Sequence, residues 1–195
     1  MECIIKNGTV IGLDLADVVI PDGVTDIGEC ALMEERIKSV KIPDSVTSIG
    51  CSAFEGSTIQ EITIDVETIE DRTFRNCMSL SSVTLGKSVR TIGQEAFEYC
   101  WALTSMTIPD SVTSIGCWAF AICGLKSVII GNNVTSIGER AFCHCTDLTS
   151  VTIPSSVTSI GYRAFYSCKN LTIYGVKGSY AETYANKNGI PFCEV

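Results

Sequence analysis

The chain is poor in basic and imidazole side chains. Its 195 residues include one histidine, 14 Lys and Arg and 22 Asp and Glu, which give a formal net charge of -8. No Lys/Arg cluster occurs, so nucleic acid and anionic membrane surfaces are disfavoured as partners. A single histidine with nothing to orient it disfavours Ser-His-Asp or Cys-His catalysis, and no Gly-rich loop of the phosphate-binding type follows a strand. The sequence therefore predicts no enzyme and no cofactor.

The chain also lacks long apolar runs. No stretch of about 18 purely apolar residues occurs, so no membrane-inserted helix is predicted. The N-terminus, MECIIKNGTVIG, lacks the basic start and apolar run of a signal peptide, so the protein stays inside the cell or has lost such a signal. Apolar residues make up 46% and charged residues 18% of the chain, which favours a large buried core over disorder.

What fills the chain is one repeated phrase. LTSVTIPSSVTSIGYRAFYSC, from Leu148 to Cys168, recurs with edits along most of the sequence. The isoleucine of its Ile-Gly-x-x-Ala-Phe segment falls at Ile27, Ile49, Ile69, Ile92, Ile115, Ile137 and Ile160. Successive spacings are 22, 20, 23, 23, 22 and 23 residues. Such a period predicts a solenoid of about seven to eight coils of 20–23 residues.

Each part of the phrase has a structural interpretation. Val-Thr-Ile alternates apolar and polar residues and predicts a short strand, which Pro154 ends because proline cannot donate to a strand ladder. The segment before Gly161 predicts a second short strand, and the glycine is expected to permit a tight turn. Ala164 and Phe165 are expected to pack inward from a helical or 3-10 turn. Stacked coils would then share one continuous apolar core.

Both ends of the chain depart from the repeat. Residues 1–14 predict an N-terminal hairpin cap with a turn at Asn7-Gly8. Residues 15–173 form the array. Residues 174–195 predict a C-terminal helix-plus-strand cap, in which Ser179 caps a helix over 180–187 and Gly189 ends it. We expect one single domain.

The phrase LTSVTIPDSVTSIGxxAFxxC resembles the BspA-like class of leucine-rich repeats, which includes treponemal leucine-rich repeat proteins. The resemblance covers about residues 15–173. It implies a curved leucine-rich repeat solenoid, β-rich with short strands, that binds a protein ligand such as host extracellular matrix or another cell surface. It also implies a cell-surface or secreted location. The chain departs from the pattern at Glu70, Thr73 and Leu32, where Gly, Ala and Phe are usual.

Eleven cysteines are the main chemical candidates. Five lie three residues after the repeat phenylalanine and predict a column of buried free thiols: Cys77, Cys100, Cys123, Cys145 and Cys168. A disulfide between neighbouring coils is the less favoured alternative. Six lie outside the column: Cys3, Cys30, Cys51, Cys117, Cys143 and Cys193. The Cys143-His144-Cys145 triplet lacks the spacing of a structural zinc site, so no metal is predicted.

The first candidate binding surface is the outward side of the first strand in each coil. Because side chains alternate along a strand, these positions should line one exposed sheet, the concave face if the array curves. The candidate residues are Glu61, Thr63, Ser82, Thr84, Ser105, Thr107, Ser127, Ile129, Ser150 and Thr152.

The second candidate surface is aromatic. Five side chains occupy variable positions near the Ala-Phe turn and are expected to face outward, as interface residues often do: Tyr99, Trp101, Trp118, Tyr162 and Tyr166. The leading hypothesis is a non-catalytic protein-protein interaction scaffold. The alternatives are a thiol-dependent or metal-binding protein, and a structural spacer without its own partner.

Overall fold

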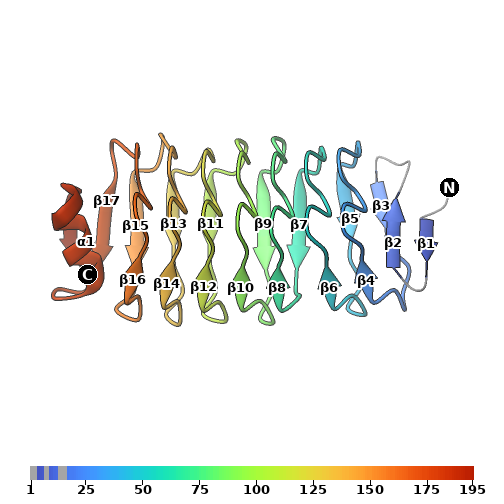
Figure 1. Ribbon diagram of the computed structural model, residues 1–195, viewed down its shortest axis with the longest axis horizontal. Coiled ribbons are helices and arrows are strands. Elements are labelled where there is room, and N and C mark those ends of the chain that lie inside the picture. Colours follow the sequence, from blue (N-terminus) through green and yellow to red (C-terminus); the bar gives the residue numbers. More distant parts are fainter. Residues whose placement is uncertain (1–3, 7–8, 13–16) are drawn as a thin grey trace.

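The computed structural model describes residues 4–6, 9–12 and 17–195. Its coils follow one another in a nearly straight row, with α1 (Tyr180–Asn188) at one end and β1 (Ile4–Lys6) at the other (Figure 1). The first strand of each coil belongs to β3 (Asp17–Val19), β5 (Ser39–Lys41), β7 (Glu61–Ile64), β9 (Ser82–Leu85), β11 (Ser105–Thr107), β13 (Ser127–Ile129), β15 (Ser150–Ile153) and β17 (Thr172–Gly175). The second belongs to β4 (Asp26–Ile27), β6 (Ser48–Ile49), β8 (Thr68–Ile69), β10 (Thr91–Ile92), β12 (Ser114–Ile115), β14 (Ser136–Ile137) and β16 (Ser159–Ile160).

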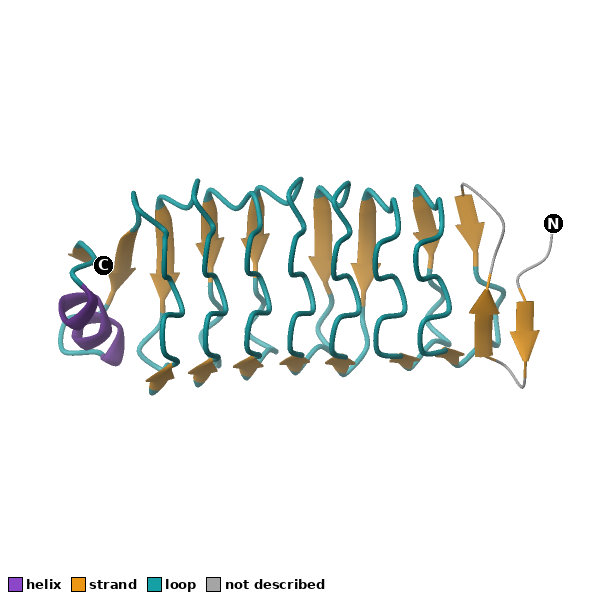
Figure 2. Ribbon diagram, turned by 45° about the horizontal axis from the view of Figure 1, so that its top comes forward, coloured by secondary structure: helices purple, strands orange, loops and turns teal. Residues whose placement is uncertain are grey.

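The strands form two stacks of parallel ladders along the row (Figure 2). Coils are numbered here 1 to 7 from β3/β4 to β15/β16, and β17 begins an eighth. Like residues pair across coils: Val128 lies opposite Val151, and Ile115 opposite Ile137. The predicted leucine-rich repeat solenoid of about eight coils is therefore confirmed.

A ladder of phenylalanine rings runs through the core. Phe54, Phe74, Phe97, Phe120, Phe142 and Phe165 stack with centroids 5.1 to 5.3 Å apart and planes within 13° of parallel. Buried Leu32 takes the same position in coil 1. At the other end Tyr184 of α1 meets Phe165 edge-on at 6.0 Å. The helix thus covers the last ring of the ladder.

The Ala-Phe segments differ from the helical or 3-10 turns expected, since α1 is the one helix among the described residues. Each is a run of tight turns with two residues at positive φ, such as Arg163 (56°) and Ser167 (65°) in coil 7. In this conformation the Phe142 N–H bonds to the Ala164 carbonyl of the next coil at 2.8 Å. In a helix these N–H groups would donate to carbonyls of the same segment, whereas in the turns they donate to carbonyls of the next coil.

The repeated glycine has a different role from the one expected. Gly161 is not among the residues with positive φ, and the positive φ falls at Arg163 instead. A Cβ on Gly161 would lie 2.4 Å from the backbone nitrogen of Glu139 in the preceding coil, and one on Gly138 would lie 2.5 Å from that of Cys117. Glycine is required at Gly138 and Gly161 because the preceding coil approaches each of them too closely for a side chain.

The two ends carry additional strands and the helix. β1 pairs antiparallel with β2 (Thr9–Gly12), and β2 pairs parallel with β4. The predicted Asn7-Gly8 turn lies outside the described residues. Ser179 caps α1 by accepting from the Glu182 N–H, and Gly189 ends it at φ 67°, as predicted. β18 (Phe192–Glu194) then pairs with β17. The boundaries of the two caps, 1–14 and 174–195, stay a prediction.

We expect Gly138→Ala to destabilise the protein by about 2–3 kcal/mol, because its Cβ has no room against a rigid neighbouring coil. Gly178 is the control: its φ is +79° and nothing lies within 4 Å of the position that a Cβ would take, so Gly178→Ala should cost only the backbone strain, about 1 kcal/mol. Urea unfolding measures both. Equal losses in the two variants would contradict the close-approach explanation.

Candidate functional site

The sheet face is defined here as the outward side of the first strands. The structure places all ten predicted sheet residues there, either exposed or half-buried. Thr63, Thr84 and Thr107 are exposed on this face, and Ser127 and Ser150 are half-buried. Ile129 is unusual for an outward position because its apolar side chain is 56% exposed. The coils lie in a nearly straight row, so this surface is named by its strands and not by a curvature (Figure 1).

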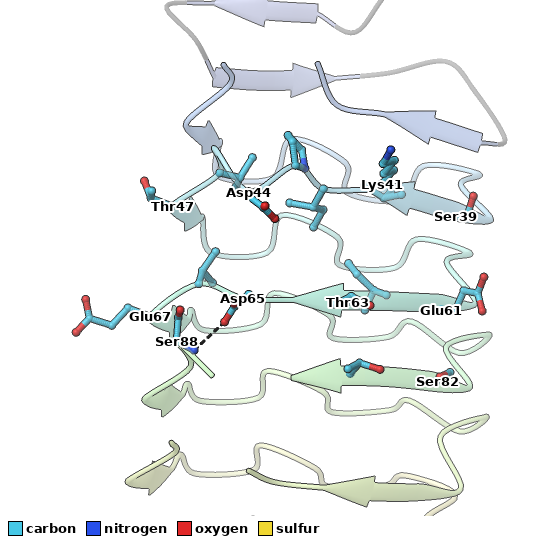
Figure 3. Close-up of a pocket in the computed structure, with 17 residues that line it drawn as sticks. Ser39, Lys41, Asp44, Thr47, Glu61, Thr63, Asp65, Glu67, Ser82 and Ser88 are labelled. Carbon is cyan, nitrogen blue, oxygen red and sulfur yellow. Dashed lines mark hydrogen bonds between the residues drawn. The ribbon is translucent and has the colours of Figure 1, made fainter. Parts of the chain in front are cut away.

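A polar hollow of about 840 Å³ opens in the sheet face over β5, β7 and β9. It lies where coil 3 is shortest: a single residue, Asp65, separates Ile64 from Val66, whereas three residues separate Ile42 from Val46. Asp65 points toward β9 and accepts a 2.7 Å hydrogen bond from the Ser88 N–H (Figure 3). The shortened turn therefore leaves a gap between coils 2 and 3.

The strand ladder also opens at this point. β5 pairs with β7 only at Ser39 and Glu61, so the two strands separate along the rest of their length. Figure 3 shows Lys41 and Asp44 on the β5 side of the gap, with Thr63 and Asp65 on the β7 side.

Sequence reasoning missed part of this hollow. The additional charged or polar lining residues include Asp44, Thr47, Asp65, Glu67 and Ser88. The 20-residue spacing between Ile49 and Ile69 was the signal that marked the place.

A second, more apolar hollow of about 490 Å³ lies over β11, β13 and β15. It forms where Gly131 follows Ile130, at the position that Pro109 and Pro154 hold in the neighbouring coils. Thr107, Ile129 and Thr152 line it. Seven of the ten predicted sheet residues therefore line one of these two hollows.

The turn face is defined here as the surface made by the Ala-Phe turns. In coils 5 to 7 it brings three of the five predicted aromatic residues together around arginines. The Arg140 guanidinium lies 4.9 Å from the ring centre of half-buried Trp118. That of Arg163 lies 4.9 Å from Tyr162 and 4.8 Å from Tyr166. The sequence pattern indicated the aromatic residues but did not show that arginines stack on them.

The other two aromatic candidates lie apart from this cluster. Tyr99 is half-buried. Trp101 is 57% exposed and lines a hollow of about 560 Å³ together with Gly124 and His144. This hollow coincides with another shortened coil, because one residue separates Cys123 from Leu125 where two separate Cys100 from Leu103.

The turn face of coils 2 to 4 is an ion network. Arg75 contacts Glu98 at 2.8 Å and Glu55 at 3.1 Å, and Arg72 contacts Glu95 at 2.8 Å. Burial raises the pKa of Glu95, but hydrogen bonds from Arg72 and Gln94 outweigh it and the pKa is lowered overall. The pKa values of both arginines are raised, mainly by hydrogen bonds to Glu95 and Glu98. Both arginines are therefore paired with carboxylates of the network, and the three carboxylates outnumber them by one.

The column cysteines are buried free thiols, as predicted, and no disulfide joins the described cysteines. Each thiol donates to the carbonyl of the phenylalanine one coil earlier, as Cys100 does to Phe74 at 3.2 Å. Burial raises the pKa of Cys77 and Cys168 to about 12. Ser57, which the sequence pattern did not indicate, takes the same position in coil 2 and is also buried. The column therefore satisfies buried carbonyls, and the raised pKa values keep Cys77 and Cys168 as unreactive thiols at neutral pH.

The Cys143-His144-Cys145 triplet does not converge on one point. Cys143 is buried, and its burial raises the pKa of its thiol to about 11. His144 is exposed and meets the Tyr166 ring edge-on at 5.6 Å. In the part of the chain that the structure describes, no three His, Cys, Asp or Glu side chains are grouped to hold a metal ion. Nothing there supports the thiol or metal alternative.

The repeats of this chain match those of a known family. The sequence profile of the BspA type leucine-rich repeat region matches residues 4–126 and 113–186 in six copies. The chain belongs to the BspA-type leucine-rich repeat family. Leucine-rich repeat proteins are commonly protein-interaction scaffolds and typically not enzymes. No curated protein sequence gives a match. Among the described residues, no helix has the length and apolar character needed to cross a membrane.

Solved structures show the same fold. A Treponema pallidum leucine-rich repeat protein has a TM-score of 0.63 and 24% identity, over 94% of this chain and 85% of that chain. One from Bacteroides ovatus has a TM-score of 0.55 and 26% identity, over 95% of this chain. The pneumococcal vaccine antigen PcpA has a TM-score of 0.56 and 16% identity, over 82% of this chain. The BspA-type chain spans 64% and 62% of the length of the last two proteins.

Thiol labelling of the native protein should separate the two cysteine environments. We expect iodoacetamide at pH 8 to modify exposed Cys30, Cys117 and Cys193, while the five column cysteines and Cys143 react only after unfolding. Peptide mass spectrometry identifies the modified sites. Native labelling of Cys100 as fast as that of Cys117 would contradict the buried column.

The raised thiol pKa values also predict alkaline instability. The unfolded thiol loses its proton near pH 8.5, whereas folded Cys77 and Cys168 keep theirs up to about pH 12. Their stability contribution is therefore complete below about pH 8.5 and is lost as the pH rises toward the folded pKa, by at most about 1.4 kcal/mol per pH unit for each thiol. Cys77→Ser, which copies the serine that coil 2 has at Ser57, should reduce this loss in urea unfolding between pH 8 and 11. An unchanged pH slope would contradict the prediction.

Proposed function

We propose that this BspA-type chain is a non-catalytic protein-binding module that contacts its partner across the sheet face. The observation that carries the proposal is the position of the two hollows. A flat Ser/Thr surface offers a partner little shape, but seven of the ten candidate residues line the hollows. Specific recognition requires such surface complementarity.

The two hollows differ in chemistry. The hollow over β5, β7 and β9 combines Lys41 with the carboxylates of Glu61 and Asp65. The hollow over β11, β13 and β15 is lined by Ile129, which is 56% exposed. A polar region beside an apolar one is typical of protein interfaces, where an apolar centre has a polar rim. Both hollows open on the same face, so one extended partner can contact them together.

The partner class follows from family resemblance. BspA-like proteins are mostly surface-exposed or secreted and act in adhesion. We therefore propose a cell-surface or secreted recognition module whose ligand is a host extracellular matrix protein or a protein of another cell surface. The acidic net charge of -8 supports a protein ligand over nucleic acid.

Sheet-face substitutions test this proposal. Thr84→Arg and Thr107→Arg place a long charged side chain at the two hollows, and each should weaken binding at least about tenfold by steric and desolvation cost. Surface plasmon resonance against immobilised extracellular matrix proteins, and binding to intact cells, provide the measurement.

Thr158→Arg is the matched control, because Thr158 is exposed beside the short strand β16, away from the sheet face. It should bind as the unsubstituted protein does. Retained binding in both Thr84→Arg and Thr107→Arg would contradict the sheet face as the binding surface. Failure to bind any matrix protein or cell would contradict the adhesion role.

A further inference from the structure

The arginines of the turn face have two different environments. In coils 3 and 4 the guanidinium groups of Arg72 and Arg75 lie 2.8 Å from the carboxylates of Glu95 and Glu98. In coils 6 and 7 the guanidinium groups of Arg140 and Arg163 lie over aromatic rings, and of these two only Arg140 also contacts a carboxylate, that of Glu139. The difference follows from the residues after the repeat phenylalanine, where coils 3 and 4 have Arg75 and Glu98 but coil 7 has Tyr166.

Arg163 is held between two rings without an anionic partner. Its guanidinium lies 4.9 Å from the Tyr162 ring centre and 4.8 Å from that of Tyr166, and these rings are 64% and 49% exposed. Among the described residues, no carboxylate lies within 4.0 Å of it and no hydrogen bond uses its side chain. The N–H donors of Arg163 therefore face solvent from a restrained position.

The preceding coil shows which group is missing. Arg140 occupies the same repeat position as Arg163, and the Glu139 carboxylate contacts it at 3.1 Å. Tyr162 stands in coil 7 where Glu139 stands in coil 6. In coil 7 the Tyr162 ring therefore stacks on the guanidinium at the position where coil 6 has a carboxylate. A carboxylate from outside can take the vacant acceptor role, with bidentate geometry that suits a planar guanidinium.

Ring stacking lowers the cost of binding at this position. A free surface arginine loses side-chain entropy when it pairs, whereas a stacked guanidinium has already lost much of it. Trp118 and Arg140 extend the same surface into coils 5 and 6. Exposed aromatic residues around a central arginine match the composition of interface hot spots.

We propose that the turn face of coils 5 to 7, centred on Arg163, is a second docking surface that binds a carboxylate-bearing acidic segment of a partner protein. The charge of the whole molecule favours this position over others. With 22 acidic and 14 basic side chains, the chain repels an acidic segment over most of its surface. The face lies apart from the sheet face, so this proposal stands or falls separately from the function proposed above.

A fluorescent decapeptide of alternating Glu and Gly tests the proposal on the full chain by fluorescence anisotropy. Binding should be measurable at low salt and weaken as the ionic strength rises, because the contact is electrostatic. The Gln-Gly decapeptide, which has the same length without charge, should bind at least about tenfold more weakly, the size expected for a lost charge-assisted hydrogen bond.

Matched variants locate the site. Arg163→Gln should weaken binding of the Glu-Gly peptide at least about tenfold, and Tyr162→Ser with Tyr166→Ser should weaken it while the arginine is kept. Arg72→Gln removes an arginine from the same face that Glu95 already neutralises, so it should leave binding unchanged. Thermal unfolding of each variant confirms that it folds.

Three results would overturn the proposal. One is equal binding of the Glu-Gly and Gln-Gly peptides. Another is unchanged binding by Arg163→Gln, or an equal loss in Arg72→Gln. The third is a heparin oligosaccharide that binds through Arg163 while the Glu-Gly peptide does not, since the surface would then select sulfate and not carboxylate.

Discussion

The short distance between coils is the constraint on which the rest of the molecule depends. Parallel strands in register set a spacing of about 5 Å, and the phenylalanine rings stack at the same spacing. At this distance a Cβ at Gly138 or Gly161 has no room, and the turns must send their N–H groups to the next coil. The column thiols satisfy the phenylalanine carbonyls within the same geometry. Backbone bonding, ring stacking and small residues thus serve one requirement, which is close contact between adjacent coils.

Surface features arise where the repeat is interrupted, because the core permits little variation. The missing residues around Asp65 coincide with the polar hollow over β5, β7 and β9, and the missing residue after Cys123 coincides with the hollow beside Trp101. Gly131 in place of proline accompanies the third. A regular solenoid would present uniform ladders of Ser and Thr. Each local departure from the repeat changes the shape of the surface while the buried columns continue through it, so binding surfaces can change without loss of the core.

The charged side chains of the turn face also differ from one part of the row to the other. On the turn face of coils 2 to 4, two arginines pair with three glutamates, so no arginine of this network is left for an external carboxylate. Farther along the row, aromatic side chains replace the carboxylates and the arginines stack on them. Because both sets occupy equivalent positions on identical turns, the backbone permits either. The side chains decide whether the surface is closed or available to a partner.

The sequence by itself determined the solenoid, the inward residues, the buried cysteine column and the caps of α1, because each follows from a local period or a local turn signal. It did not determine that the Ala-Phe segments are tight turns with residues at positive φ, since thirteen non-glycine residues adopt positive φ there and eleven of them donate their N–H groups to the neighbouring coil. The hollow around Asp65 and the arginines between Tyr162, Tyr166 and Trp118 also required the structure. The Asp65–Ser88 and Trp118–Arg140 contacts join residues of different coils, and a contact across coils depends on how the backbones stack, which no single repeat encodes.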